Sequence, residues 1–117
     1  MVFSGDALLV NDVGRPDLHS GGDPAPLARS LHSSVRKLLE LPDGVLLFPS
    51  HYGGSVCGRS LSGNPFSTIG FERRHNQSLE LDEEAFVAEA LRNLPPPPAD
   101  QEAIVAANRT GRARAAA

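Results

Sequence analysis

The stretch Val2–Asp17, with the sequence VFSGDALLVNDVGRPD, decides how this chain folds. Two short apolar segments, Val2–Phe3 and Ala7–Val10, have the composition of buried strands. Between them stands an acid, Asp6, and after them comes a segment rich in turn-forming residues, Asn11–Asp17. The sequence therefore predicts two strand segments that are interrupted by a carboxylate and followed by a turn.

An acid between two strands of a core is expensive to bury unless it is paired or binds a cation. Gly5 precedes Asp6 and lets the backbone come close to whatever the carboxylate faces. We predict that Asp6 is a metal ligand at the end of a core strand and that Asn11–Asp17 forms a loop over the same site. The alternative is that Asp6 caps a turn and accepts hydrogen bonds from backbone N–H groups.

Length and composition narrow the function classes. The chain has 117 residues, 40% of them hydrophobic, which suits one small domain. Its net charge of −3 disfavours nucleic acid and anionic membranes as partners. No apolar run approaches the ~20 residues of a membrane-spanning helix. A single cysteine, Cys57, allows no disulfide within the chain, which fits a cytoplasmic protein.

The segment after the opening stretch has the pattern of a helix followed by a strand. Apolar residues recur at helical spacing between Pro24 and Glu40, and a Pro-Asp-Gly turn ends this helix. Val45–Phe48 is then a short apolar run typical of a buried strand. Strand, helix and strand with short links predict an α/β fold, in which sites gather on the loops after the strands. His51 lies in such a loop and mirrors Asp6.

The C-terminal part of the chain has the pattern of further helices. Ser67 or Thr68 is suited to cap a short helix that runs to Arg74. An acidic segment, residues 82–84, is suited to the start of the next helix. We expect one domain over residues 1–94, and a proline-rich spacer with a weakly ordered tail over residues 95–117 that includes one weak helix, residues 100–108. Because a strand begins almost at Met1, we also expect the chain to be part of a larger fold.

Asp6 and His51 form the main candidate site. Carboxylate and imidazole are ligands for zinc and for non-haem iron, but a catalytic centre of this kind usually has three protein ligands. We expect the other histidines, His19, His32 and His75, to be solvated. The sequence alone therefore predicts an incomplete metal site.

Five further residues are candidates around this pair. Arg15 and Asp17 are expected to pair and pin their loop, or else to present the arginine to a substrate carboxylate. Arg73 and Arg74 can bind an anionic ligand, or lie at a solvated helix end. Tyr52 can donate a hydrogen bond into the site, or pack with its hydroxyl in water.

Two residues with nucleophilic side chains give weaker signals. Cys57 has no neighbouring base to stabilise a thiolate, so we predict that it is not catalytic. Ser50 is adjacent to His51, but the Gly-x-Ser-x-Gly turn of serine hydrolases is absent. The sequence therefore favours metal chemistry over covalent catalysis.

Four blocks of the sequence, in this order, carry a family resemblance: FSGDALLVNDVGRPDL (3–18), FPSHYGG (48–54), STIGFERRHNQSL (67–79) and EEAFVAEALRNLPPPP (83–98). They resemble the C-terminal half of metallo-β-lactamase-fold proteins, and within these the persulfide dioxygenase and glyoxalase II-like group, some of whose members are fused to a rhodanese domain. The resemblance implies half of a four-layer αββα sandwich, with a mixed sheet and flanking helices.

The resemblance also implies roles for particular residues. Asp6 matches a metal ligand of the family, and His51 matches a histidine that ligates a second metal in the hydrolases or contacts the metal's ligands in the dioxygenases. Tyr52 and Arg73, with Arg74 as a close alternative, match residues linked with glutathione binding. Asn-Gln stands at residues 76–77 where the family usually has Asn-Pro.

The family's His-x-His-x-Asp-His motif is not found in these residues. The resemblance therefore implies a truncated protein that is inactive alone, with Fe(II) or Zn(II) incompletely held. The implied parent reaction is Fe(II)-dependent oxidation of glutathione persulfide, and the alternative is zinc-dependent thioester hydrolysis. A further alternative is a non-catalytic fragment that pairs with a separate N-terminal half. A homo-oligomer that covers the missing half is another expectation.

Overall fold

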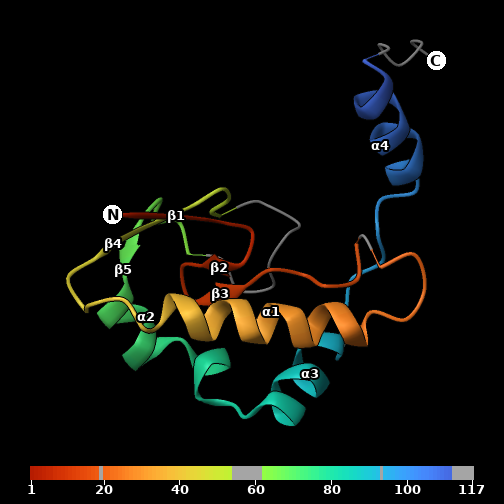
Figure 1. Cartoon of the computed structure of the whole chain (residues 1–117). Helices are drawn as coiled ribbons and strands as arrows, with labels where there is room; N and C mark the ends of the chain where they lie inside the picture. The colour runs from red at the N-terminus through yellow and green to blue at the C-terminus, as the bar shows by residue number, and fades with distance from the viewer. Residues whose placement is uncertain (19, 54–61, 93, 112–117) are drawn as a thin grey trace.

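Three short strands form the central sheet of the protein (Figure 1). The computed structural model describes residues 1–18, 20–53, 62–92 and 94–111. The sheet has the strand order β1–β4–β5, with bounds β1 Val2–Gly5, β4 Leu46–Pro49 and β5 Ser67–Thr68. β1 and β4 are parallel, with Phe3 opposite Phe48, and β5 is antiparallel to β4. The predicted mixed α/β sheet is confirmed.

Helix α1, Ala25–Leu38, crosses between the parallel strands and lies along one face of the fold (Figure 1). Ala28 and Val35 are its buried residues, and they join the core together with Leu47 of β4. A right-handed crossover helix is the usual connection between neighbouring parallel strands, because parallel strands cannot be joined by a tight turn. The predicted strand–helix–strand unit is therefore present.

A hairpin, which the sequence did not predict, follows β1. Strands β2, Leu8–Leu9, and β3, Asp12–Val13, pair in antiparallel fashion. The prediction of a continuous loop over residues 11–17 was wrong in its first part, because Val13 is apolar and pairs with buried Leu8 in the core. Asn11 makes the tight turn with φ of 63°, a left-handed conformation that asparagine adopts more readily than most residues.

Helices α2, Ile69–His75, and α3, Glu83–Leu91, follow the sheet and are joined by the short 3₁₀ helix η1, Gln77–Glu80. The Thr68 side chain accepts a hydrogen bond from Phe71 N, and the Asp82 side chain accepts one from Ala85 N. These caps satisfy N–H groups that have no partner within the helix. Both predicted helix starts are confirmed.

Helix α4, Gln101–Thr110, stands apart from the rest of the fold (Figure 1). None of its residues is buried. The weak helix predicted over residues 100–108 is present, while the domain boundary at residue 94 stays a prediction. Within the described residues, no helix is both long and apolar enough to cross a membrane.

The two faces of the sheet differ in what covers them. Val2 and Leu47 point toward the hydrophobic core, where α1, α2 and α3 contribute side chains. Phe3 alternates with Val2 along β1 and is exposed. Its ring stacks on that of Phe48, with centroids 5.6 Å apart. One face is thus packed, and the other presents aromatic rings.

Candidate metal centre

Asp6, Ser50 and His51 meet where β1 and β4 end, and we call these three residues the metal edge. The two strands are parallel, so the residues that follow them lie at the same edge of the sheet. His51 Nδ1 lies 2.6 Å from Asp6 Oδ1 and 3.2 Å from Ser50 Oγ. Ser50 Oγ also donates a hydrogen bond to Asp6 Oδ1. The structure thus brings together the two residues that the sequence paired, and adds Ser50 to them.

The backbone ties the two turns of the metal edge to each other. Ser50 N donates to the carbonyl of Gly5, with a length of 3.1 Å. Gly5 has φ of +57°, a conformation that glycine adopts without strain. A Cβ at Gly5 would meet nothing within 4 Å among the described atoms, so within the described residues the positive φ, rather than a close contact, accounts for this glycine. Gly5 serves to turn the chain sharply after β1.

Gly14 packs directly beneath Asp6. A Cβ at residue 14 would lie 1.9 Å from the Asp6 carbonyl oxygen, well inside any tolerable contact. Gly14 N also donates to Ala7 O at 3.3 Å. Only glycine fits here, because any side chain would overlap the Asp6 carbonyl oxygen. We call the segment that contains Gly14, directly after β3, the backbone wall, because it lies against the backbone of Asp6. The sequence signal was the Gly-Arg-Pro motif, which indicated a turn but not what it packs against.

The metal edge is open to solvent. The side chain of Asp6 is 58% exposed and that of His51 is 38% exposed. The premise that Asp6 is a buried acid was therefore wrong, because the turn at Gly5 carries it past the end of the core strand. An accessible carboxylate next to an imidazole is a donor set that suits zinc and iron. Among the described residues no third His, Cys, Asp or Glu joins these two, so they fit a metal as two ligands of a larger set.

Arg15 and Asp17 make a two-point ion pair. Arg15 Nε lies 3.1 Å from Asp17 Oδ1, and Nη2 lies 2.7 Å from Oδ2. Arg15 Nη2 also donates to Pro95 O at 2.6 Å, and the arginine side chain is only 3% exposed. The hydrogen bond from Arg15 holds the pKa of Asp17 below its usual value. This geometry fits loop pinning rather than an arginine presented to a substrate.

The structure does not bring Arg73 and Arg74 to the metal edge. Both donate to the carboxylate of Asp43, in the turn before β4, and the Arg74 contact is 2.6 Å long. Arg73 Nη2 also donates to the carbonyls of Leu39 and Leu41. Because β4 runs from this turn toward Ser50, the two arginines lie at its opposite end.

The remaining candidates have mixed outcomes. Tyr52 follows His51 in the chain and is 53% exposed. His32, expected on the surface, is instead half-buried, with its ring 5.0 Å from that of Phe86 on α3. The helical spacing of apolar residues on α1 predicts which side chains face the sheet. It does not predict that α3 packs against His32, so the surface position was wrong. His75 is exposed as predicted, and the predictions for His19 and Cys57 lie outside the described residues.

Sequence reasoning missed Glu72, which is fully buried on α2. Its Oε1 accepts from Ser67 Oγ at 2.6 Å, and its Oε2 accepts from Asn11 N at 2.9 Å and from Asn76 Nδ2 at 3.0 Å. Three donors satisfy this acid without a metal. The signal was its place on the buried face of α2, in helical register with Ile69 and Asn76. Glu72 fastens the β2–β3 turn to α2.

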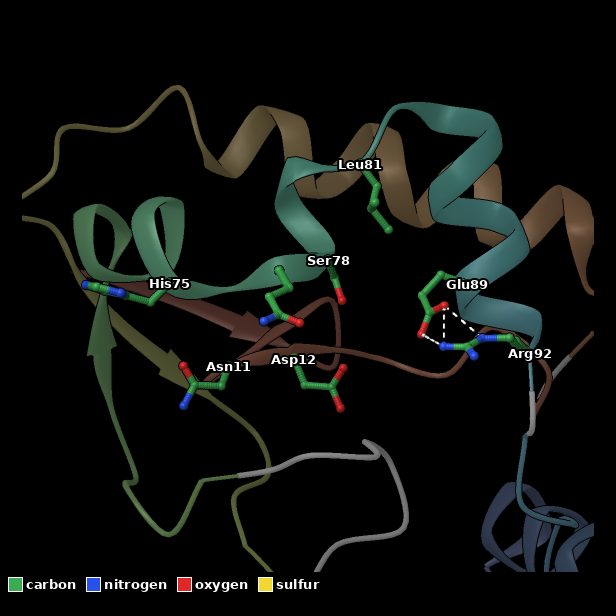
Figure 2. Close-up of a pocket in the computed structure, with 8 residues that line it drawn as sticks. Asn11, Asp12, His75, Ser78, Leu81, Glu89 and Arg92 are labelled. Carbon is green, nitrogen blue, oxygen red and sulfur yellow. Dashed lines mark hydrogen bonds and ion pairs between the residues drawn. The ribbon is translucent and has the colours of Figure 1, made fainter.

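A cleft of about 690 Å³ opens between the β2–β3 turn, η1 and α3 (Figure 2). Its lining residues are Asn11, Asp12, His75, Gln77, Ser78, Leu81, Glu89 and Arg92. Glu89 and Arg92 pair with each other across one wall, 2.8 Å apart. No residue of the metal edge contributes to this cleft. It is therefore separate from the candidate metal centre.

Comparison with known proteins gives relatives but no family model, since none matches the sequence. Persulfide dioxygenase ETHE1, mitochondrial, of Bos taurus is 35% identical over 113 residues. The match covers 95% of this chain and 39% of the bovine protein, and it falls in the C-terminal part of the relative. The chain thus spans about two fifths of the length of this relative.

Two solved structures share the fold. A metallo-β-lactamase from Staphylococcus aureus superposes with a TM-score of 0.81 and 32% identity, over 91% of this chain and 30% of its own. ETHE1 from Myxococcus xanthus superposes with a TM-score of 0.73 and 32% identity, over 93% of this chain and 44% of its own. At these scores and identities both the fold and common ancestry are shown.

Proposed function

We propose that this chain, which belongs to the metallo-β-lactamase-fold superfamily and has persulfide dioxygenases among its relatives, supplies part of the metal centre of a persulfide dioxygenase. One observation carries the proposal. Two side chains of the right chemistry, Asp6 and His51, converge to 2.6 Å at the shared edge of two parallel strands. The bovine relative is a persulfide dioxygenase by name, which favours dioxygenase over thioester hydrolase chemistry.

In this proposal Asp6 is a direct ligand of Fe(II), with Zn(II) as the alternative metal. His51 is either a further ligand or the group that orients the Asp6 carboxylate through Nδ1. Ser50 donates to Asp6 Oδ1 and so limits the rotation of the carboxylate. When bound, the iron supplies the redox chemistry that dioxygen requires. The backbone wall at Gly14 keeps this ligand in place.

We propose glutathione persulfide as the substrate. Tyr52 is the candidate contact, because it directly follows His51 in the chain and is 53% exposed. Arg73 and Arg74 can serve only if they leave Asp43, which holds both of them in this structure. We therefore expect Tyr52→Phe to raise KM for the substrate, and a change at Arg73 to act first on stability.

We further propose that these 117 residues are inactive alone, because the described part of the chain provides two metal ligands where three are usual. Other ligands would come from a separate N-terminal half. The cytoplasm is the proposed compartment, on the ground of the single cysteine. The bovine relative is a mitochondrial protein by name.

Metal retention by the purified chain tests the ligand assignment. Wild type, Asp6→Ala and Asp43→Ala are equilibrated with Zn(II), or anaerobically with Fe(II), and the dissociation constant is measured by titration. We expect weak binding that falls at least ~10-fold in Asp6→Ala and is unchanged in Asp43→Ala, because only one of these acids faces the metal edge. Equal binding in Asp6→Ala would contradict its role, and tight stoichiometric binding in wild type would contradict an incomplete site.

The reaction is tested on a completed protein, in which this chain is fused behind the N-terminal part of the bovine relative. We expect dioxygen uptake on addition of glutathione persulfide, with Fe(II) as the metal that supports it. Cleavage of a glutathione thioester without dioxygen uptake would favour the hydrolase instead.

A further inference from the structure

Glu72 on α2 and Asn76 at its C-terminal end hold the β2–β3 hairpin at its turn, and we call these two residues the hairpin clamp. Glu72 is fully buried and Asn76 is 1% exposed. Glu72 Oε2 accepts a hydrogen bond from Asn11 N at 2.9 Å, and Asn76 Nδ2 donates to the carbonyl of Asp12 at 3.2 Å. Asn76 Nδ2 also donates to Glu72 Oε2 at 3.0 Å, so the two side chains of the clamp orient each other.

The hairpin is too short to fix its own position. Leu8 pairs with Val13 and Leu9 with Asp12, so each strand has two residues. Even a longer isolated hairpin is only marginally stable in water, so this one depends on its contacts with the rest of the fold. Leu8 and Val13 pack in the hydrophobic core, but apolar contacts have no preferred direction. The hydrogen bonds of the clamp do have one, and they therefore set where the turn lies.

The hairpin connects the clamp to Asp6. Three residues separate Asn11 from Gly14, which corresponds to about 10 Å at the rise of a strand. At Gly14 the backbone wall lies so close to the Asp6 carbonyl oxygen that an added Cβ would be 1.9 Å from it. Gly14 N also donates to Ala7 O at 3.3 Å, directly after Asp6. A shift of the hairpin turn is therefore passed through the backbone wall to the backbone of Asp6.

We propose that Glu72 is a positioning residue for the metal edge, because its hold on the hairpin keeps Asp6 where the carboxylate can share a metal with His51. This inference rests on the proposed function, since it takes Asp6 as a metal ligand. A ligand group that is held in place beforehand loses less freedom when the metal binds, and so binds it more tightly. Because the Asp6 side chain is 58% exposed, its position depends more on its backbone than on packing.

The hydrogen bonds of Glu72 show which substitutions keep its hold on the hairpin. Oε2 accepts from Asn11 N and Asn76 Nδ2, while Oε1 accepts from Ser67 Oγ at 2.6 Å. A hydroxyl can accept as well as donate, so a glutamine can point its amide nitrogen at Ser67 and keep its oxygen toward the hairpin. An alanine instead leaves two buried N–H groups without this acceptor. The two substitutions therefore separate the hydrogen bonds of Glu72 from its charge.

The test measures the Zn(II) dissociation constant and urea unfolding of the full chain, for variants that circular dichroism shows to be folded. Glu72→Ala removes the acceptor that holds the hairpin. Ser67→Ala is the matched control, because it takes one hydrogen bond from the same buried acid and leaves both contacts between clamp and hairpin. Val35→Ala is a second control, which truncates a buried core residue of α1.

We expect all three alanine variants to unfold at lower urea concentration, but only Glu72→Ala to bind Zn(II) more weakly. The loss should be about 3- to 10-fold, below the ~10–100-fold of a group that contacts a metal ligand directly, because Glu72 acts through the backbone. Glu72→Gln should bind Zn(II) within about 2-fold of wild type, since it can keep both contacts with the hairpin.

Equal Zn(II) affinity in Glu72→Ala and Ser67→Ala would overturn the positioning role. So would an equal loss in Glu72→Ala and Glu72→Gln, because the charge of the acid, rather than its hold on the hairpin, would then govern the affinity. If Glu72→Ala does not fold, Asn76→Ala takes its place, since it removes the contact with Asp12 of the same hairpin. Wild-type affinity in a folded Asn76→Ala variant then contradicts the proposal.

Asp6→Ala, measured alongside, separates the positioning role from the proposed function. If Asp6→Ala binds Zn(II) more weakly while Glu72→Ala binds it like wild type, the ligand role of Asp6 stands and the positioning role alone is overturned. If Asp6→Ala binds Zn(II) like wild type, the ligand role is wrong and the positioning role falls with it.

Discussion

The two ends of strand β4 each hold a carboxylate beside groups that can donate to it, but only one of the carboxylates is paired with guanidinium groups. Before the strand, Asp43 accepts from the guanidinium groups of Arg73 and Arg74. After the strand, Asp6 faces the Ser50 hydroxyl and the imidazole of His51. Each end has one acid with two side-chain partners, yet the partners differ in their chemistry.

The two ends differ in the chemistry of the groups that donate to the carboxylate. Guanidinium groups are always charged and can only donate hydrogen bonds. The two that share the Asp43 carboxylate therefore leave it little capacity to bind another cation. An imidazole can be neutral, and its nitrogen can bind a metal as well as a proton. The end with Asp43 therefore fastens the turn before β4 to α2, whereas the end with Asp6 keeps lone pairs for a ligand.

Each end also has a glycine beside its acid, and the two glycines differ in what they contact. At residue 14 a Cβ would lie 1.9 Å from the backbone oxygen of Asp6. At residue 70 it would lie 2.7 Å from the side chain of Asp43. Rotation of a side chain relieves neither contact, because the nearest Asp43 atom is its Cβ, which the backbone fixes, but the overlap at residue 14 is the deeper of the two. The metal edge is thus more sensitive to its glycine than the opposite end.

Gly14→Ala is expected to have the largest effect on stability. The added methyl group overlaps a carbonyl oxygen and must displace the β1–β2 turn, which should lower the free energy of unfolding by about 3 kcal/mol. Urea unfolding followed by circular dichroism measures it. Gly70→Ala is the matched control and should lower the free energy of unfolding by a smaller amount. An equal loss in both variants would contradict the proposed difference between the two glycines.

Asp17→Asn comes next, and its effect depends on pH. The Arg15 hydrogen bond lowers the pKa of Asp17 below the usual 3.8, so the folded state favours the ionised form. The stability from this pair is present above about pH 4, and is lost as the pH falls through the lowered pKa. At pH 7 the variant should lose about 2 kcal/mol, because a nearly buried guanidinium loses its counterion.

The pH profile of unfolding separates this pair from a general charge effect. Wild type should lose more stability between pH 5 and pH 3 than Asp17→Asn does, since the variant has no carboxylate to protonate at this position. Glu40→Gln removes one negative charge from an exposed residue and is the control. Parallel profiles for wild type and Asp17→Asn would show that the ion pair contributes nothing.

The smallest effects are expected from the two acids at the ends of β4. Asp43→Ala should cost about 1 kcal/mol, because its ion pairs are partly exposed and screened by solvent. Asp6→Ala should change the free energy of unfolding by less than about 0.5 kcal/mol, since it is an exposed residue away from the core. A larger loss in Asp6→Ala than in Asp43→Ala, measured by thermal unfolding, would make Asp6 a structural acid.

Local sequence patterns were sufficient to predict most of the elements. The apolar spacing of α1, the turn before β4 and the caps at Thr68 and Asp82 each act within a few residues, and the structure has all of them. The parallel pairing of β1 with β4 followed from the helix between them. Asp6 and His51 were paired for the same reason, because the ends of such strands meet.

What the sequence did not predict depends on contacts between distant segments. The strand at Val13 exists because Leu8 pairs with it, and the burial of His32 depends on where Phe86 packs. The arginines at residues 73 and 74 fitted an anion site until the fold placed Asp43 against them. In each case the partner lies far along the chain or in a turn whose direction no local pattern specifies.

The hydrogen bond from Asn11 N to buried Glu72 has a consequence for the time scale on which the β2–β3 turn opens. A turn residue normally exchanges its amide hydrogen with water rapidly, but this hydrogen is released only when the hairpin lifts away from α2. The Asn11 amide should therefore be among the slowly exchanging ones, and its rate reports how often the wall behind Asp6 comes apart. Hydrogen exchange at this one amide therefore measures how stable the backbone beside the metal edge is against local opening.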